Sequence, residues 1–242
     1  MLGLTSGISS GDLITDLPPS DYSMSFDGVS DFLAISSTTF PIELDGEDLS
    51  ISFWVKRDSD DGDASCILGL SSTVAFSRVH FNADGDELMI ESNKNAEYAK
   101  ATVTADTNWH HYVITLQGAG SGAGGSSIPI IYEDGVALST TNNNWGNSVD
   151  YDITIDRIGS DGGGGTTELK GLLYQLAIFD AVLTPATVTA MYNGGTPIGI
   201  SNMGGLLHLW RFSENTGSTT ADSAGSLTAT LNGNAAFSST TP

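Results

Sequence analysis

Residues Leu49–Lys56 read LSISFWVK, and this stretch decides the fold class. Every second residue is apolar, and the residues between them are mostly polar; the apolar set is Leu49, Ile51, Phe53 and Val55. Successive side chains of a strand point to opposite faces, so this set lines one face of a pleated strand. The stretch therefore predicts a β-strand with one face in a hydrophobic core.

Short runs rich in β-forming residues recur on both sides of this strand. Asp-Gly pairs separate several of them, and such pairs tolerate the positive φ of tight hairpins; Asn82–Leu88 (NADGDEL) is the clearest hairpin. Many short strands joined by turns are typical of an antiparallel sandwich or jelly roll. The runs are Tyr22–Phe26, Phe32–Ile35, Cys66–Leu70, Arg78–Phe81, Glu87–Glu91, His110–Leu116, Ile128–Tyr132, Tyr151–Ile158, Leu169–Phe179 and Leu206–Phe212.

One short helix is predicted near residue 185. Thr184 is a favourable N-cap, and Pro185 occupies the first helical position, where its missing N–H costs nothing. The segment ends at Asn193–Gly195, which suits left-handed geometry. Helical spacing places three residues on one side, which we expect to pack against a sheet: Val188, Met191 and Tyr192.

Composition excludes several classes of protein. The 242 residues include 29 Asp and Glu against 8 Lys and Arg, a formal net charge of −21. So few cations cannot neutralise a row of phosphates, so we expect neither nucleic-acid nor membrane binding. The apolar run Leu172–Val182 is too short to span a bilayer, and nothing in Met1–Leu17 resembles a secretory signal. The single Cys66 lies in an apolar run and is interpreted as a small buried hydrophobe.

Several motifs resemble a known family. In their order and spacing they are similar to the concanavalin A-like, laminin G-like jelly-roll domain, over Asp21–Pro197. The resemblance implies an all-β antiparallel sandwich at 21–197, an N-terminal arm at 1–20 and C-terminal edge strands with a tail at 198–242. The motifs are SFDGVSDF (25–32), LSISFWVK (49–56), NWHHYV (108–113), IYEDGV (131–136), GLLYQLAIFDAVLT (171–184) and MYNGGTP (191–197).

The C-terminal segment resembles the opening of such a unit, with LLHLWRF at 206–212 and ADSAG at 221–225. Either it folds back to close its own sandwich, or it pairs with a neighbouring subunit. The layout is similar to virion and tail-associated proteins of marine bacteriophages. That resemblance implies a non-enzymatic virion structural or decoration protein on the particle surface, with other virion proteins or copies of itself as partners. The alternative is a glycan-binding adhesion module that recognises surface glycans outside the cell.

A hydrolase is the least favoured interpretation. The string ELDGE at 43–47 resembles the E-x-D-x-E pattern of laminarinase-type glycosidases, which implies Glu43 as nucleophile, Asp45 as its helper and Glu47 as acid/base. Asp45-Gly46 is a turn signal, however, and it interrupts the strand that this geometry needs. The adjacent His110 and His111 point to opposite faces of one strand and cannot chelate one ion. We therefore expect no enzymatic activity.

A calcium site is the one cofactor that the resemblance suggests. It points to Asp27 and Asp31, which flank the first hairpin and would meet an oxygen ligand from a later loop. Relatives often supply an Asp in the strand that matches Leu172–Leu176, where this chain has Tyr174. The alternative is that both Asp residues only form turns.

A carbohydrate site is predicted at Asn142–Asn147, which reads NNNWGN. Trp145 can stack on a sugar ring, and the amides of Asn143, Asn144 and Asn147 can bond its hydroxyl groups. The alternative is an Asn-rich turn with one tucked Trp.

Overall fold

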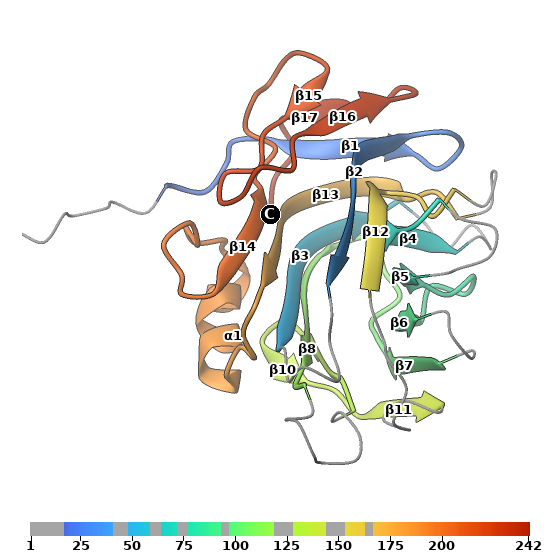
Figure 1. The fold of residues 1–242 in the computed structure, drawn as a ribbon, viewed down its shortest axis with the longest axis vertical. Helices are drawn as coiled ribbons and strands as arrows, with labels where there is room; N and C mark the ends of the chain where they lie inside the picture. The colour runs from blue at the N-terminus through green and yellow to red at the C-terminus, as the bar shows by residue number, and fades with distance from the viewer. Residues whose placement is uncertain are drawn as a thin grey trace, which may run out of the picture.

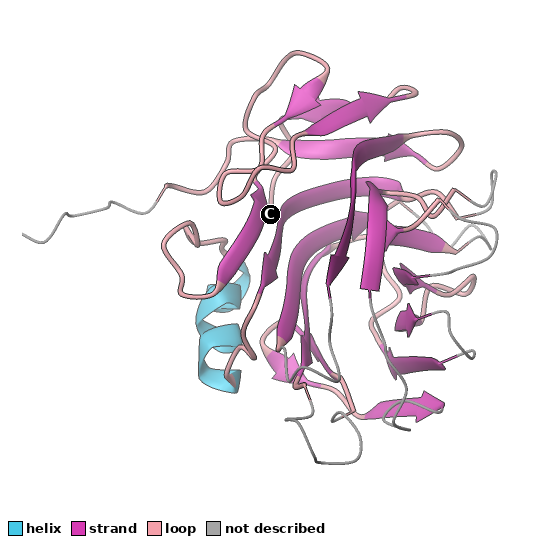
Figure 2. Cartoon of the chain, viewed as in Figure 1, coloured by secondary structure: helices cyan, strands magenta, loops and turns pink. Residues whose placement is uncertain are grey.

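The computed structural model describes residues 17–40, 48–58, 64–71, 77–92, 97–118, 128–143, 153–162 and 167–242. They form two antiparallel sheets packed face to face, with one α-helix outside them (Figures 1 and 2). The all-β sandwich that the sequence predicts is thereby confirmed. Neither described helix has the length and apolar character needed to cross a bilayer.

Sheet A has eight strands in the order β10-β9-β8-β3-β13-β1-β17, and β14 also pairs with β13. Its strands are β1 (Ser23–Asp27), β3 (Leu49–Arg57), β8 (Trp109–Leu116), β9 (Ile130–Glu133), β10 (Val136–Ala137), β13 (Lys170–Phe179), β14 (Leu206–Trp210) and β17 (Ala236–Ser238).

Sheet B has nine strands in the order β11-β7-β6-β5-β4-β12-β2-β16-β15. Its strands are β2 (Phe32–Phe40), β4 (Ser65–Gly69), β5 (Ser77–Phe81), β6 (Glu87–Ser92), β7 (Glu97–Thr102), β11 (Thr140–Asn143), β12 (Ile153–Ile158), β15 (Thr219–Thr220) and β16 (Ala229–Asn232). The hairpin predicted at Asn82–Leu88 joins β5 to β6, as expected.

The core between the sheets takes the apolar set of β3, as the alternation predicts. The other face of β3 is buried as well, because the chain returns over it after β13. Ser50 accepts a hydrogen bond from the Leu183 N–H at 3.0 Å and donates to the Ala181 carbonyl at 2.6 Å. The Ser50 hydroxyl thus provides hydrogen-bond partners for two backbone groups of the covering segment. Strand β3 therefore has two buried faces.

The covering segment contains helix α1 (Pro185–Tyr192), followed by the 3-10 turn η1 (Asn193–Gly195). The Thr184 hydroxyl accepts the Thr187 N–H at 3.1 Å, so the predicted N-cap is confirmed. The helix buries Val188 and Met191 against the outer face of sheet A. Together they form a second, smaller core with Val113, Tyr132, Ala177, Phe179, Leu183, Ile200 and Leu209.

The C-terminal strands extend both sheets of their own chain. Strand β14 pairs with β13, β16 with β2, and β17 with β1. The buried carboxylate of Asp222 fixes the connection after β14, because it accepts the N–H groups of Leu209, Gly225 and Leu227 at 2.8 to 3.0 Å and lies 2.6 Å from His208 Nδ1. Although burial opposes it, these bonds hold the pKa of Asp222 well below its usual range.

Candidate functional site

Among the described residues, no helix or strand covers the outer face of sheet B at β5, β6, β7 and β11. In β6 and β7 the residues Leu88, Ile90 and Ala99 are fully buried in the core, so the residues between them point outward. These strands lie on the side of the molecule away from α1 (Figure 1). We call the outward set the open face: Arg78, His80, Glu87, Met89, Glu91, Tyr98, Lys100, Thr141 and Asn143.

Ion pairs cross the open face between neighbouring strands. Arg78 Nε lies 2.5 Å from Glu91 Oε2, and Arg78 Nη1 lies 2.9 Å from Asp161 Oδ2. Burial alone would raise the pKa of Glu91, but the hydrogen bonds and charges of His80 and Arg78 lower it to about 2. Glu91 is therefore ionised at any pH at which the protein is expected to work.

Tyr98 is the aromatic side chain of the open face, and it is partly exposed. Its cross-strand neighbours are Glu91 on β6 and Asn143 on β11. The Nζ of Lys100 lies 5.9 Å from the ring centroid. A ring flanked by a carboxylate and an amide offers a sugar both a stacking surface and partners for its hydroxyl groups.

The predicted carbohydrate residues fall only partly within the described chain. Asn143 is the last residue of β11 and lies beside Tyr98, whereas Asn144, Trp145 and Asn147 lie outside the described residues. Carbohydrate binding by all four stays a prediction. Sequence reasoning missed Tyr98, although the alternation in Glu97–Thr102 (EYAKAT) sets its ring and Lys100 on one face.

Asp27 and Asp31 lie together at the turn between β1 and β2, and N–H groups bond all four of their carboxylate oxygens. Asp31 accepts the Asp27 N–H at 2.8 Å and the Asn234 N–H at 2.5 Å. Asp27 accepts the N–H of Val29 at 2.9 Å, that of Ser30 at 3.3 Å and the Asn234 side chain at 3.2 Å. The pair ties this turn to the C-terminal segment, and calcium at it stays a prediction.

In the part of the chain that the structure describes, no group of three or more His, Cys, Asp and Glu side chains is arranged to hold a metal ion. The ELDGE string at 43–47 lies outside that part. Cys66 is buried as predicted, and its thiol donates to the Leu68 carbonyl. Burial raises the pKa of this thiol well above its usual value, so it is a poor nucleophile.

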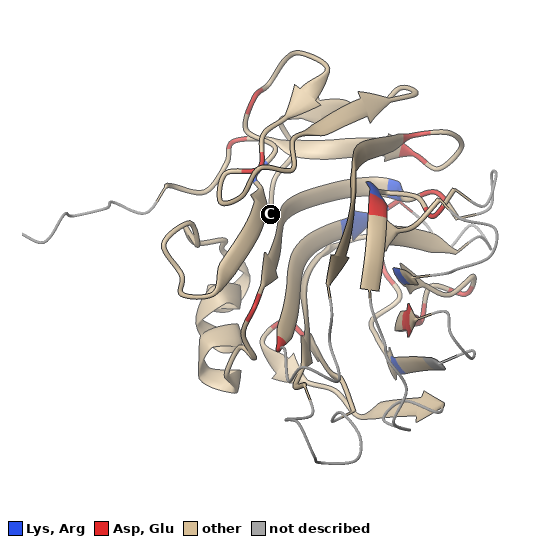
Figure 3. Cartoon of the chain, viewed as in Figure 1, with Lys and Arg blue, Asp and Glu red and all other residues tan. Residues whose placement is uncertain are grey.

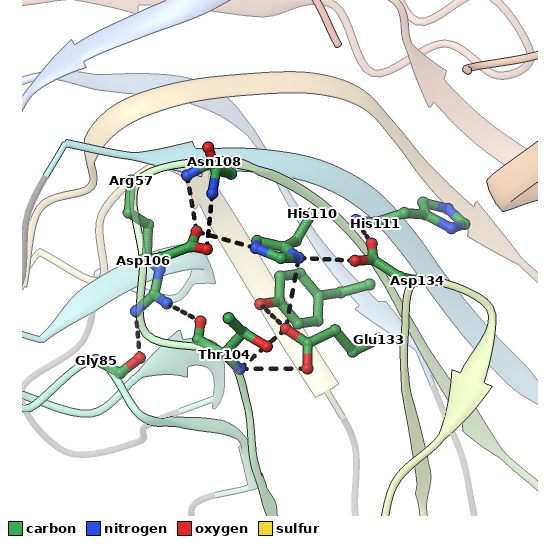
Figure 4. Close-up of polar contacts among 10 residues, drawn as sticks. Arg57, Gly85, Thr104, Asp106, Asn108, His110, His111, Glu133 and Asp134 are labelled. Carbon is green, nitrogen blue, oxygen red and sulfur yellow. Dashed lines mark hydrogen bonds and ion pairs between the residues drawn. The ribbon is translucent and has the colours of Figure 1, made fainter. Parts of the chain in front are cut away.

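A second polar cluster surrounds His110 (Figure 4). His110 Nδ1 lies 2.8 Å from Asp134 Oδ2, and Nε2 lies 3.0 Å from Asp106 Oδ1. The hydrogen bond to Asp134, helped by Asp106, raises the pKa of His110 to about 9 despite partial burial. His110 is therefore an imidazolium at neutral pH, held between two carboxylates.

The partners of this cluster are themselves fully engaged. Glu133 accepts the Tyr112 hydroxyl at 2.9 Å and the Thr104 N–H at 3.0 Å. Arg57 donates to the Thr104 carbonyl at 2.8 Å and to the Gly85 carbonyl. Its Cζ lies 4.3 Å from the ring centroid of Phe81. These contacts join β3, β8 and β9 to the neighbouring loops, so we interpret the cluster as one that stabilises the fold (Figure 4).

The neighbouring His111 points to the other face of β8, as the sequence predicts. It stacks on Trp54 with ring centroids 4.8 Å apart, and its Nε2 lies 2.9 Å from the Ser52 hydroxyl. Complete burial lowers the pKa of His111 to about 3. At neutral pH one of these adjacent histidines is thus protonated and the other neutral, and because they point to opposite faces they cannot chelate one ion.

Comparisons with known proteins agree with this architecture. A family model described as the concanavalin A-like lectin/glucanases superfamily matches residues 27–189. A proposed carbohydrate-binding protein from Bacteroides ovatus has a similar structure, with a TM-score of 0.63 and 16% identity over 92% of this chain and 60% of that one. A heptameric SAP-like pentraxin from Limulus polyphemus gives a TM-score of 0.50 and 19% identity, over 71% of this chain and 82% of that one. No curated protein sequence matches the chain.

Proposed function

Since the chain belongs to the concanavalin A-like lectin/glucanase superfamily, we propose that it is a non-enzymatic glycan-binding module that binds its ligand on the open face. The Bacteroides ovatus protein of similar fold, itself described as carbohydrate-binding, supports this choice. This chain spans 60% of that protein's length, so the likeness concerns one module of a larger molecule.

The observation on which the proposal rests is the place of Tyr98. Its partly exposed ring lies between Glu91 and Asn143, and Asn143 is the second residue of the NNNWGN segment that the sequence predicts to bind sugar. Sugars are bound by an aromatic face combined with a few oriented polar groups. Strands β6, β7 and β11 bring both kinds of group to the open face.

A binding role is favoured over a catalytic one by the state of the carboxylates. Retaining and inverting glycosidases both need one carboxyl group that can donate a proton near neutral pH. Glu91 has its pKa lowered to about 2, and Glu87 is paired with Lys100 at 2.8 Å. Glu91, ionised and bonded to Arg78, is not suited to act as that acid.

The test is a glycan array probed with the wild-type protein and with Tyr98→Ala. We expect Tyr98→Ala to lose about 1 to 3 kcal/mol of binding free energy, a signal loss of about tenfold or more. The matched control is Tyr22→Ala, which removes a partly exposed Tyr that precedes β1 of sheet A. Equal signals from the wild type and Tyr98→Ala would reject the open face as the site.

Trp145→Ala tests the sequence prediction in the same array. A loss of signal comparable to that of Tyr98→Ala would mean that the NNNWGN segment and the open face bind the same glycan. If Trp145→Ala binds as the wild type does while Tyr98→Ala does not, the segment is only a turn beside the site.

We further propose that the module works on the surface of a virus particle, beside other virion proteins or copies of itself. The support is the sequence layout at 191–242, in which MYNGGTP precedes a WRF strand and a Ser/Thr-rich end. Mass spectrometry of purified particles tests this role. The protein should appear there as a stoichiometric component, and its absence from the particles would overturn the proposal.

A further inference from the structure

We propose that the open face selects neutral glycans and rejects acidic ones. The inference rests on the proposed function, and it names the class of ligand that the site takes. It follows from how the cations of the open face are already engaged, and from the total charge around Tyr98.

Arg78 cannot turn toward a ligand without exposing buried charge. Its guanidinium bonds Glu91 through Nε and Asp161 through Nη1. The Asp161 side chain is only 4% exposed and also accepts the Thr167 hydroxyl. A ligand carboxylate that captured Arg78 would leave Asp161 as a buried, poorly compensated anion, which is strongly unfavourable.

Lys100 is also engaged by a carboxylate of the chain. Its Nζ lies 2.8 Å from Glu87 Oε1 and 2.9 Å from Glu87 Oε2. Glu87 is held in place by Asn82, whose side-chain carbonyl accepts the Glu87 N–H at 3.0 Å. The ion pair is thus built into the β5–β6 hairpin and is present before any ligand arrives.

The charges around Tyr98 sum to a negative value. Among the described residues, the two cations Arg78 and Lys100 are paired with three carboxylates, those of Glu87, Glu91 and the neighbouring Asp161, so the carboxylates outnumber the cations by one. The Nε2 of His80 lies 3.2 Å from Glu91, so a proton on His80 would face that same carboxylate. The whole chain carries a net charge of −21. An acidic sugar therefore meets repulsion here, and among the described residues of the open face it finds no cation without a carboxylate partner.

Arg157, another cation of sheet B, makes no side-chain ion pair or hydrogen bond to the described residues, and it lies outside the open face. The guanidinium of Arg157 stacks 4.1 Å above the Phe32 ring, over β12 and β2. Gly69 of β4 pairs with Arg157 on one side and with Arg78 of β5 on the other. A Cβ at Gly69 would lie 2.6 Å from Asp161 Cα, so Asp161 lies over the Gly69 backbone, between Arg157 and β5. Most Lys and Arg positions of the described chain lie on the side away from α1 (Figure 3). Arg157 belongs to β12, between β2 and β4, and is not part of the open face.

The experiment compares neutral glycans with sialylated and sulfated ones, at low and at high salt, on the wild type and two variants. The wild type should bind neutral glycans at least about tenfold more strongly than acidic ones, with little dependence of the neutral signal on salt. Glu87→Gln removes the partner of Lys100 and should add binding of acidic glycans that high salt abolishes. Arg157→Ala is the matched control and should behave as the wild type.

The outcomes separate this inference from the proposed function. If the wild type binds acidic glycans as strongly as neutral ones, the charge argument is overturned and glycan binding stands. If Arg157→Ala abolishes an acidic signal of the wild type, the ligand site lies on β12 and β2 instead. Binding of no glycan of either class overturns the proposed function and this inference with it.

Discussion

The outer faces of the two sheets differ, although both arise from the same alternation of apolar and polar residues. On sheet A the segment after β13 crosses the outer face, so that Trp54 is 2% exposed and Phe179 is fully buried. We call the part of sheet A under this segment the sealed face. On sheet B the open face holds ion pairs and a partly exposed Tyr98. The crossing segment is thus what makes the two outer faces of the described chain differ.

Removing a large side chain from the sealed face should have the largest effect on stability. Phe179→Ala is expected to cost about 3 to 5 kcal/mol of the free energy of unfolding, because it leaves a cavity between β13 and α1. Met89→Ala on the open face is the control and should cost much less, since Met89 is partly exposed. Urea unfolding measures both, and similar losses would mean that the two faces are equally covered.

Acid should weaken the sealed face before it breaks the ion pairs of the open face. Burial lowers the pKa of His111 to about 3 from its ordinary 6.5, so the unfolded chain binds a proton there that the folded chain rejects. The stability contributed by neutral His111 is complete above pH 6.5 and falls below it by about 1.4 kcal/mol per pH unit until about pH 3. At pH 5 the loss is about 2 kcal/mol.

The measurement is the free energy of unfolding of wild type and His111→Gln between pH 7 and pH 5. The difference between the two proteins should shrink or reverse as the pH falls, because only the wild type has this histidine to protonate. Glu91, with a pKa of about 2, stays ionised across the whole range. A constant difference would show that His111 is accessible to protons in the folded state.

The sealed face was more predictable from sequence than the open face. Strand β3 and helix α1 have strong local signals, in the alternation of LSISFWVK and in the Thr184-Pro185 start. Strands β7 and β11 have weaker signals, because the Glu, Ala and Lys residues of EYAKAT and the two Asn residues of TTNN are depleted in strands. They are strands because β6 pairs with β7 and β7 with β11, a long-range arrangement that no local pattern reports.

The burial of Ser50 has a similar origin. In the sequence it belongs to the polar set of LSISFWVK, and its partner Ala181 lies 131 residues further on. Sequence periodicity reports that a residue alternates, but whether its face is covered depends on the path of the later chain. Since Tyr98 and Asn143 meet only through such pairing, the candidate site could be assembled only from the structure.

Weakening the helix start should loosen the sealed face by a smaller amount. Thr184→Ala removes the hydroxyl that accepts the Thr187 N–H, and it should cost about 1 kcal/mol of the free energy of unfolding. Thr184→Ser keeps an acceptor at the same position and serves as the control. If both variants lose the same amount, the cap hydroxyl contributes nothing, and the packing of Val188 and Met191 holds the helix on sheet A.

The smallest effect on stability is expected on the open face itself. Lys100→Met breaks the ion pair with Glu87, in which both side chains are more than a quarter exposed, at 29% and 26%. Pairs so exposed contribute about 0.2 to 1 kcal/mol, and salt screens them. The difference in unfolding free energy between wild type and Lys100→Met should therefore be below about 1 kcal/mol at low salt and vanish at high salt. A larger loss that salt leaves unchanged would mean that this pair holds the sheet together, and the charges of the open face would then belong to the fold and not to a ligand.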